Sequence, residues 1–135
     1  MIQNYKELDV RKRYVAFTIE LYRLTCRLPD SERYGLISQI RRAATSIPAN
    51  IAEGWGRGST GEYIQFLTIA RGSLMELETH PIVGCNLSML SAEELGSLSL
   101  QVEDIGKMLN RLIAALKTRR LGSKSESRTP NPEPR

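Results

Sequence analysis

Apolar residues recur at steps of three and four in four segments of the chain, and no segment shows the sustained alternation of a β-strand. The first segment is followed by Pro29, which is expected to end its helix. The last segment is introduced by Ser91, which forms a capping box with Glu94 three residues later. The two apolar faces consist of Val10, Tyr14, Phe17, Leu21, Leu24 and Leu28 in the first helix, and Leu95, Leu98, Val102, Ile105, Leu109, Leu112 and Leu116 in the last.

Two further helices are predicted between these segments. The second helix is expected to begin near residues 31–33, and the third at a capping box formed by Ser59 and Glu62. In the third helix, Gly72 and Ser73 are expected to leave room for the close approach of a neighbouring helix. The apolar arcs are Leu36, Ile40, Ala43, Ala44, Ile47, Ile51 and Trp55 in the second helix, and Tyr63, Phe66, Leu67, Ala70, Leu74 and Leu77 in the third.

Prolines and glycines interrupt these two helices. The isoleucine spacing runs through Pro48 without losing register, so we predict one kinked helix there rather than a loop. Pro81 removes a helical hydrogen bond, and the third helix is expected either to kink there or to end within a few residues. Gly54, Gly56 and Gly58 allow positive φ where the chain turns into the third helix, so they indicate a helix end rather than a phosphate-binding loop.

Four helices with short connections predict an all-α fold, an antiparallel up-down-up-down four-helix bundle over residues 1–121. A chain of 135 residues fits one domain that needs no disulfides. Residues 122–135 hold three prolines and no large apolar residue, so we expect a disordered C-terminal tail. No apolar run approaches the roughly 20 residues that span a membrane, and no secretory signal is seen, so we expect a cytoplasmic protein without a membrane partner.

The net charge of +4 is located in the C-terminal part of the chain. Residues 1–116 contain equal numbers of basic and acidic residues, whereas residues 117–135 contain six basic and two acidic residues. Within the neutral part, residues 1–58 are mainly basic and residues 59–116 mainly acidic. This polarity is compatible with self-association and equally with nucleic-acid binding.

Candidates for catalysis or metal binding are few. Cys26, Cys85 and the single histidine, His80, cannot complete a zinc site without outside ligands. Glu76 stands four residues before His80, whereas di-metal sites in bundles use a Glu-x-x-His spacing. The sequence offers no coupled set of acid, base and nucleophile. We therefore expect no enzymatic activity, no cofactor, no metal and no small-molecule substrate.

A polar stripe runs beside the apolar arc of the second helix, from Gln39 to Glu53, within about 80° on a helical wheel. Such a stripe is either solvated surface or a contact between subunits made through charge-assisted hydrogen bonds. Trp55 is interpreted as an anchor in a packing or subunit interface. The candidate oligomer-interface residues are Arg42, Ser46, Asn50, Glu53 and Trp55.

Clustered cations are an alternative basis for function, because they can contact the phosphates of RNA or DNA. Surfaces that bind single strands usually combine cations with aromatic residues, and no aromatic residues are interleaved with these cations. The candidate nucleic-acid-binding residues are Arg11, Lys12, Arg13, Arg41, Arg42 and Arg57.

The segments "QIRRAATSIPANIAEG" and "GSLMEL" resemble the central motif of a family of bacterial four-helix bundle proteins encoded in intervening sequences of 23S ribosomal RNA genes. The resemblance covers roughly residues 5–118. It implies a compact antiparallel bundle that associates into a ring-shaped homopentamer, without established enzymatic activity. The accessory protein of diversity-generating retroelements, which binds nucleic acid, is similar in fold, and this is an analogy of fold alone.

Two hypotheses follow for the function. The first is a non-enzymatic oligomeric bundle that binds RNA, DNA or a nucleoprotein partner. The second is a homo-oligomeric scaffold or assembly protein with no nucleic-acid role.

Overall fold

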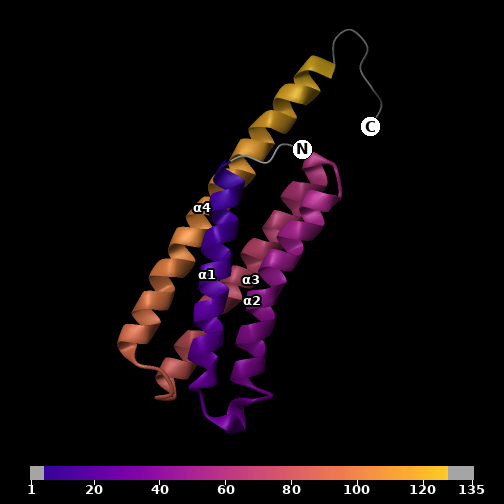
Figure 1. Ribbon diagram of the computed structural model, residues 1–135. Helices are drawn as coiled ribbons and strands as arrows, with labels where there is room; N and C mark the ends of the chain where they lie inside the picture. Colours follow the sequence, from indigo (N-terminus) through magenta and orange to yellow (C-terminus); the bar gives the residue numbers. More distant parts are fainter. Residues whose placement is uncertain (1–4, 128–135) are drawn as a thin grey trace.

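The computed structural model describes the backbone of residues 5–127 and the side chains of residues 9–122. It contains four helices, α1 (Tyr5–Cys26), α2 (Leu36–Gly56), α3 (Thr60–Asn86) and α4 (Ala92–Ser127), and a single 3₁₀ turn, η1 (Asp30–Glu32), between α1 and α2. Successive helices run in opposite directions (Figure 1). The predicted all-α four-helix bundle is therefore confirmed.

Side-chain pairs between helices fix the antiparallel register. Along α1 and α4, Arg13 pairs with Asp104, whereas Arg27, near the other end of α1, pairs with Glu94. The position on α4 falls as the position on α1 rises, as antiparallel neighbours require. Between α2 and α3, the Ser46 and Ser73 hydroxyls lie 2.9 Å apart.

The core is built from the apolar faces that the residue spacing predicts. The α1 stripe from Val10 to Leu28 is buried throughout, and so is the α4 stripe from Leu98 to Leu116. Phe66 and Leu95 are only half-buried, while Ile64, Leu90 and Ile113 add to the core. Continuous burial along all four helices provides the hydrophobic driving force for the bundle.

Neither internal proline ends its helix. The second helix continues through Pro48 to Gly56, as predicted, and α3 continues through Pro81 to Asn86. Pro48 is exposed and Pro81 is buried. The chain therefore stays helical on both sides of each proline.

The second helix begins later than the start near residues 31–33 that the residue pattern predicts. Residues 30–32 form the 3₁₀ turn, and α2 starts at Leu36, after Gly35. The reason is a side-chain cap, because the Leu36 amide donates to Oε1 of Glu32 at 2.9 Å. This bond satisfies one of the free amides that every helix N-terminus presents.

Of the two predicted capping boxes, the second is complete and the first is formed in part, because the Glu62 carboxylate meets the Ser59 hydroxyl rather than the Ser59 amide. In the first, the Glu62 amide donates to Ser59 Oγ at 3.2 Å. In the second, the Glu94 amide donates to Ser91 Oγ at 3.0 Å, and the Ser91 amide donates back to Glu94 Oε1 at 2.9 Å. The hydrogen bond from the Ser91 amide, followed by Arg27, holds the pKa of Glu94 below its ordinary value.

The last helix does not end at residue 121. Its backbone is helical as far as Ser127, so residues 122–127 of the expected tail continue α4. Residues 128–135 lie outside the described part of the chain. Within that part, no helix has the length and apolar character needed to cross a membrane.

Candidate nucleic-acid and subunit interfaces

The three cations near the start of α1 differ in their surroundings. Arg11, Lys12 and Arg13 are all exposed. Nη1 of Arg13 lies 3.6 Å from Oδ2 of Asp104, so its charge is partly neutralised. Arg11 and Lys12 form no ion pair with the side chains of residues 9–122. Two of the three cations therefore remain available to a ligand.

Arg41 is held within the chain by three neighbours on α1. Its Nε donates to Oγ1 of Thr25 at 2.8 Å, and its guanidinium carbon lies 4.6 Å from the ring centroid of Tyr22. Its Nη2 also donates to Sγ of Cys26 at 3.5 Å. Thr25 is fully buried, so this bond joins α2 to the C-terminal end of α1. Arg41 therefore stabilises helix packing through cation–π and hydrogen-bond contacts.

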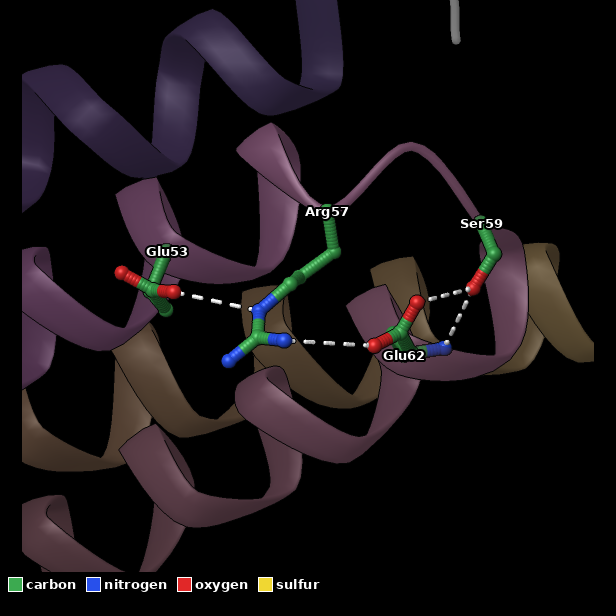
Figure 2. A network of polar contacts seen from close by, with 4 residues as sticks. All are labelled: Glu53, Arg57, Ser59 and Glu62. Carbon is green, nitrogen blue, oxygen red and sulfur yellow. Dashed lines mark hydrogen bonds and ion pairs between the residues drawn. The ribbon is translucent and has the colours of Figure 1, made fainter.

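Arg57 is neutralised by two carboxylates at the turn between α2 and α3 (Figure 2). Its Nε lies 3.1 Å from Oε2 of Glu53, and its Nη1 lies 3.6 Å from Oε2 of Glu62. Ser59 Oγ donates to the other oxygen of Glu62 at 3.0 Å. Gly58, with φ of 84°, makes the turn itself. This network stabilises the α2–α3 turn. Because the two carboxylates offset the charge of Arg57, its attraction for a phosphate is weak.

The six predicted cations therefore do not form one patch. Arg41 contacts the C-terminal end of α1, whereas Arg57 follows α2 at the opposite end of the bundle, about 24 Å farther along the helix axis at 1.5 Å per residue. Arg42 is exposed near Arg41 and donates to Oε1 of Gln39 in its own helix.

The C-terminal part of α4 supplies further cations, which are not among the six predicted from the sequence. In Figure 1 the last turns of α4, coloured yellow, extend beyond the start of α1 and the α2–α3 turn. Arg120 reaches α3, because a Cβ built on Gly61 would lie 3.2 Å from its Nη1. We call the exposed cations at this end of the bundle the basic end; its members, Arg11, Lys12, Arg111, Lys117, Arg119 and Arg120, form no ion pair with residues 9–122.

The run of basic residues at 117–120 was visible in the sequence. Its charge was counted with that of residues 122–135, although the run itself lies within the predicted bundle. Helix α4 carries these residues on an ordered element whose last turns extend past the start of α1.

The polar stripe of α2 makes its contacts inside the chain. Ser46 bonds Ser73 of α3, and Nδ2 of Asn50 donates to the Ser46 carbonyl at 2.8 Å and to Ser46 Oγ at 3.1 Å. Glu53 pairs with Arg57, as described above. Trp55 is half-buried, and its ring lies edge-on to that of Tyr63, with 5.9 Å between centroids. Three of the five candidate interface residues, Ser46, Glu53 and Trp55, thus contribute to packing of α2 against α3 or to the turn between them, and Asn50 bonds within α2.

A cavity of about 70 Å³ lies where α1 crosses α2, next to Trp55 and Pro48. The Tyr14 side chain reaches this cavity, and its buried hydroxyl has no hydrogen-bond partner among the described residues. Burial raises the pKa of Tyr14 far above its ordinary value. The hydroxyl therefore stays protonated through the neutral range.

The cysteines and the histidine considered for metal binding or catalysis lie toward the ends of α1 and α3. Cys26 is exposed at the end of α1, Cys85 is half-buried near the end of α3, and His80 is half-buried one turn before it. Among the side chains that the structure describes, no three of His, Cys, Asp or Glu gather in a way that could hold a metal ion.

Comparison with known proteins places these features in a family. A family model described as 23S rRNA-intervening sequence protein matches residues 6–111, well over half of the chain. A crystal structure of a protein with unknown function from the S23 ribosomal protein family, from Bacteroides thetaiotaomicron, superposes with a TM-score of 0.75 at 25% identity. The match covers 81% of this chain and 98% of that one. No match was found among curated proteins.

Proposed function

Since the chain belongs to the 23S rRNA-intervening sequence protein family, we propose that it acts by binding rather than by catalysis, and that its ligand is nucleic acid. The observation that carries the proposal is the basic end, six exposed cations with no acidic partner among residues 9–122. A cation without an ion-pair partner gains the most interaction energy from a phosphate, because no carboxylate has to be displaced before the phosphate binds.

The chemistry of the basic end favours contacts with the phosphate backbone over the reading of bases. Lysine and arginine on a helix surface release condensed counterions when they bind phosphates, which gives affinity that does not depend on sequence. Lys117, Arg119 and Arg120 lie at different angles around a helix whose last turns extend past the start of α1, so they reach phosphates on more than one side.

The test compares two double variants with equal change in charge. Lys117→Glu with Arg119→Glu alters the basic end, and Arg33→Glu with Arg42→Glu alters the opposite end of the bundle. Binding to a fluorescein-labelled RNA hairpin is measured by anisotropy at several salt concentrations. The first variant is expected to weaken binding and to reduce the slope of log affinity against log salt by about 2, while the second leaves both close to wild type.

Either of two results would overturn this proposal. One is equal weakening by both double variants, which would show general attraction to a charged protein rather than a site. The other is a wild-type protein that does not bind the hairpin even at low salt.

A second candidate function is self-association as a homo-oligomeric scaffold, for which the resemblance implies a pentamer. It is favoured by half-exposed apolar side chains on α1 and by exposed ones on α3 and α4. Light scattering on the wild-type protein tests it, because a monomeric mass at about 100 μM would remove it. Glu53→Ala is expected to leave the oligomer intact, since Glu53 pairs within its own chain.

A further inference from the structure

The solvent side of α1 carries an apolar ridge. Val15, Ile19 and Tyr22 follow one another at steps of four and three, and 52%, 48% and 37% of their surfaces are exposed. We call these three residues the α1 ridge. Exposed apolar side chains are ordinary when they are scattered, but a continuous row on one helix face indicates a contact surface. Arg11, Lys12 and Arg23 are exposed on the same helix and form no ion pair with residues 9–122.

A groove of about 520 Å³ lies between α3 and α4. Met75 and Leu100, 47% and 65% exposed, supply its large apolar side chains. We call it the α3–α4 groove. Gly96 also lines it, and a Cβ built there would meet no atom within 4 Å, so packing inside the chain does not require glycine at this position. The small residue leaves the groove open to a helix from outside.

The charges on the two surfaces are complementary. Glu78 and Glu103 line the groove and form no ion pair with the described side chains, and Lys107 is the single cation in its lining. The α1 ridge, in contrast, is accompanied by cations. The same difference is seen in the chain as a whole, because the half that contains α1 is basic and the half that contains the groove is acidic. Opposite charge on two surfaces raises association rates and fixes their orientation.

We propose that the α1 ridge of one copy of this chain docks into the α3–α4 groove of a second copy. The proposal rests on the second candidate function, self-association, and assigns its two surfaces. Inside one chain the ridge cannot fill the groove, because α1 packs against α2 and α4. Since the ridge and the groove are different surfaces, the contact is heterologous, and repeating it produces a closed ring or a filament.

The test uses one variant for each surface. Ile19→Lys disables the ridge and leaves the groove intact, and Leu100→Lys disables the groove and leaves the ridge intact. Tyr34→Lys, at a residue 87% exposed in the turn before α2, is the matched control. Val15→Lys serves as a second ridge variant, and circular dichroism confirms that each variant keeps the helical content of wild type.

The masses are read by native mass spectrometry and light scattering. Wild type and Tyr34→Lys are expected to form the same oligomer, and each surface variant alone is expected to be monomeric. An equal mixture of Ile19→Lys and Leu100→Lys is expected to form a one-to-one dimer and nothing larger, because one intact ridge and one intact groove remain.

Three results would overturn the assignment. If the wild type is monomeric, self-association and the assignment fail together. If the wild type is oligomeric but Leu100→Lys is too, the groove is not the docking site, and self-association itself stands. If both variants are monomeric but their mixture does not dimerise, the ridge and the groove are not partners.

Discussion

At Gly54 the backbones of α2 and α3 come close together, and replacement of this glycine by alanine is expected to destabilise the bundle. A Cβ at Gly54 would lie 2.7 Å from Cβ of Phe66 and 3.1 Å from Cδ1 of Tyr63. The Phe66 atom is attached directly to the backbone of α3, so the clash is relieved only if one helix moves. Such overpacking costs about 1–3 kcal/mol, whereas the helix propensity of alanine returns at most about 1 kcal/mol. We expect a net loss of about 1–2 kcal/mol in the free energy of unfolding.

Gly72→Ala is the matched control, because it adds the same methyl group to an exposed position of α3. Its Cβ would meet no atom within 4 Å, so only the gain in helix propensity of about 0.5–1 kcal/mol is expected. Urea unfolding followed by circular dichroism, at a single protein concentration, measures both changes. Equal stabilisation by the two substitutions would refute the inferred close contact between α2 and α3.

Three further predictions follow from single contacts. Ser46→Ala is expected to lower the free energy of unfolding by about 1 kcal/mol, because it leaves the buried Ser73 hydroxyl unpaired, and adding Ser73→Ala is expected to recover part of that loss. A double-mutant cycle measured by urea unfolding tests this coupling, and additive losses in the double variant would contradict it. Tyr14→Phe is expected not to lower stability at pH 7, because the buried Tyr14 hydroxyl has no hydrogen-bond partner among the described residues. Since folding raises the pKa of Tyr14, the wild type should lose stability above about pH 10, and thermal unfolding at a series of pH values should show a smaller loss for the variant. Glu94→Gln is expected to remove a contribution of the Glu94 carboxylate to stability. That contribution is present above the unfolded pKa of about 4.3 and is lost as the pH falls through the lower folded pKa, so the stabilities of variant and wild type should converge in acid unfolding.

The helices were predictable from the sequence because burial along a bundle follows the helical period. Gly54 and Gly72 show what the helical period does not predict. Gly72 was expected to allow close approach of a helix, yet space around it is open, while Gly54, interpreted as a helix end, makes the close contact. Whether a glycine makes a close contact depends on the distance to a neighbouring helix, and the spacing of residues along one helix does not predict that distance. Ser73, next to Gly72, is buried and bonded to Ser46, as its predicted position in the contact requires.

The candidate cations were harder to predict than the core. The sequence gives the number of arginines but not their partners, so Arg41 and Arg57 seemed as available as Arg11. In the structure, an aromatic ring and a buried hydroxyl hold Arg41, and two carboxylates hold Arg57. Conversely, the charges of Lys117 and Arg119 were counted with those of the tail, and no site was assigned to them, although both lie within the predicted bundle.

Salt dependence of nucleic-acid binding by the wild-type protein tests the central proposal most directly. The affinity for a labelled RNA hairpin is measured from about 50 to 200 mM salt. If the six cations of the basic end contact phosphates, log affinity should fall against log salt with a slope of about −4 to −5, at 0.7–0.9 per contact. A slope near zero, or no binding at the lowest salt, would contradict the proposal that the basic end of this bundle is a nucleic-acid-binding surface.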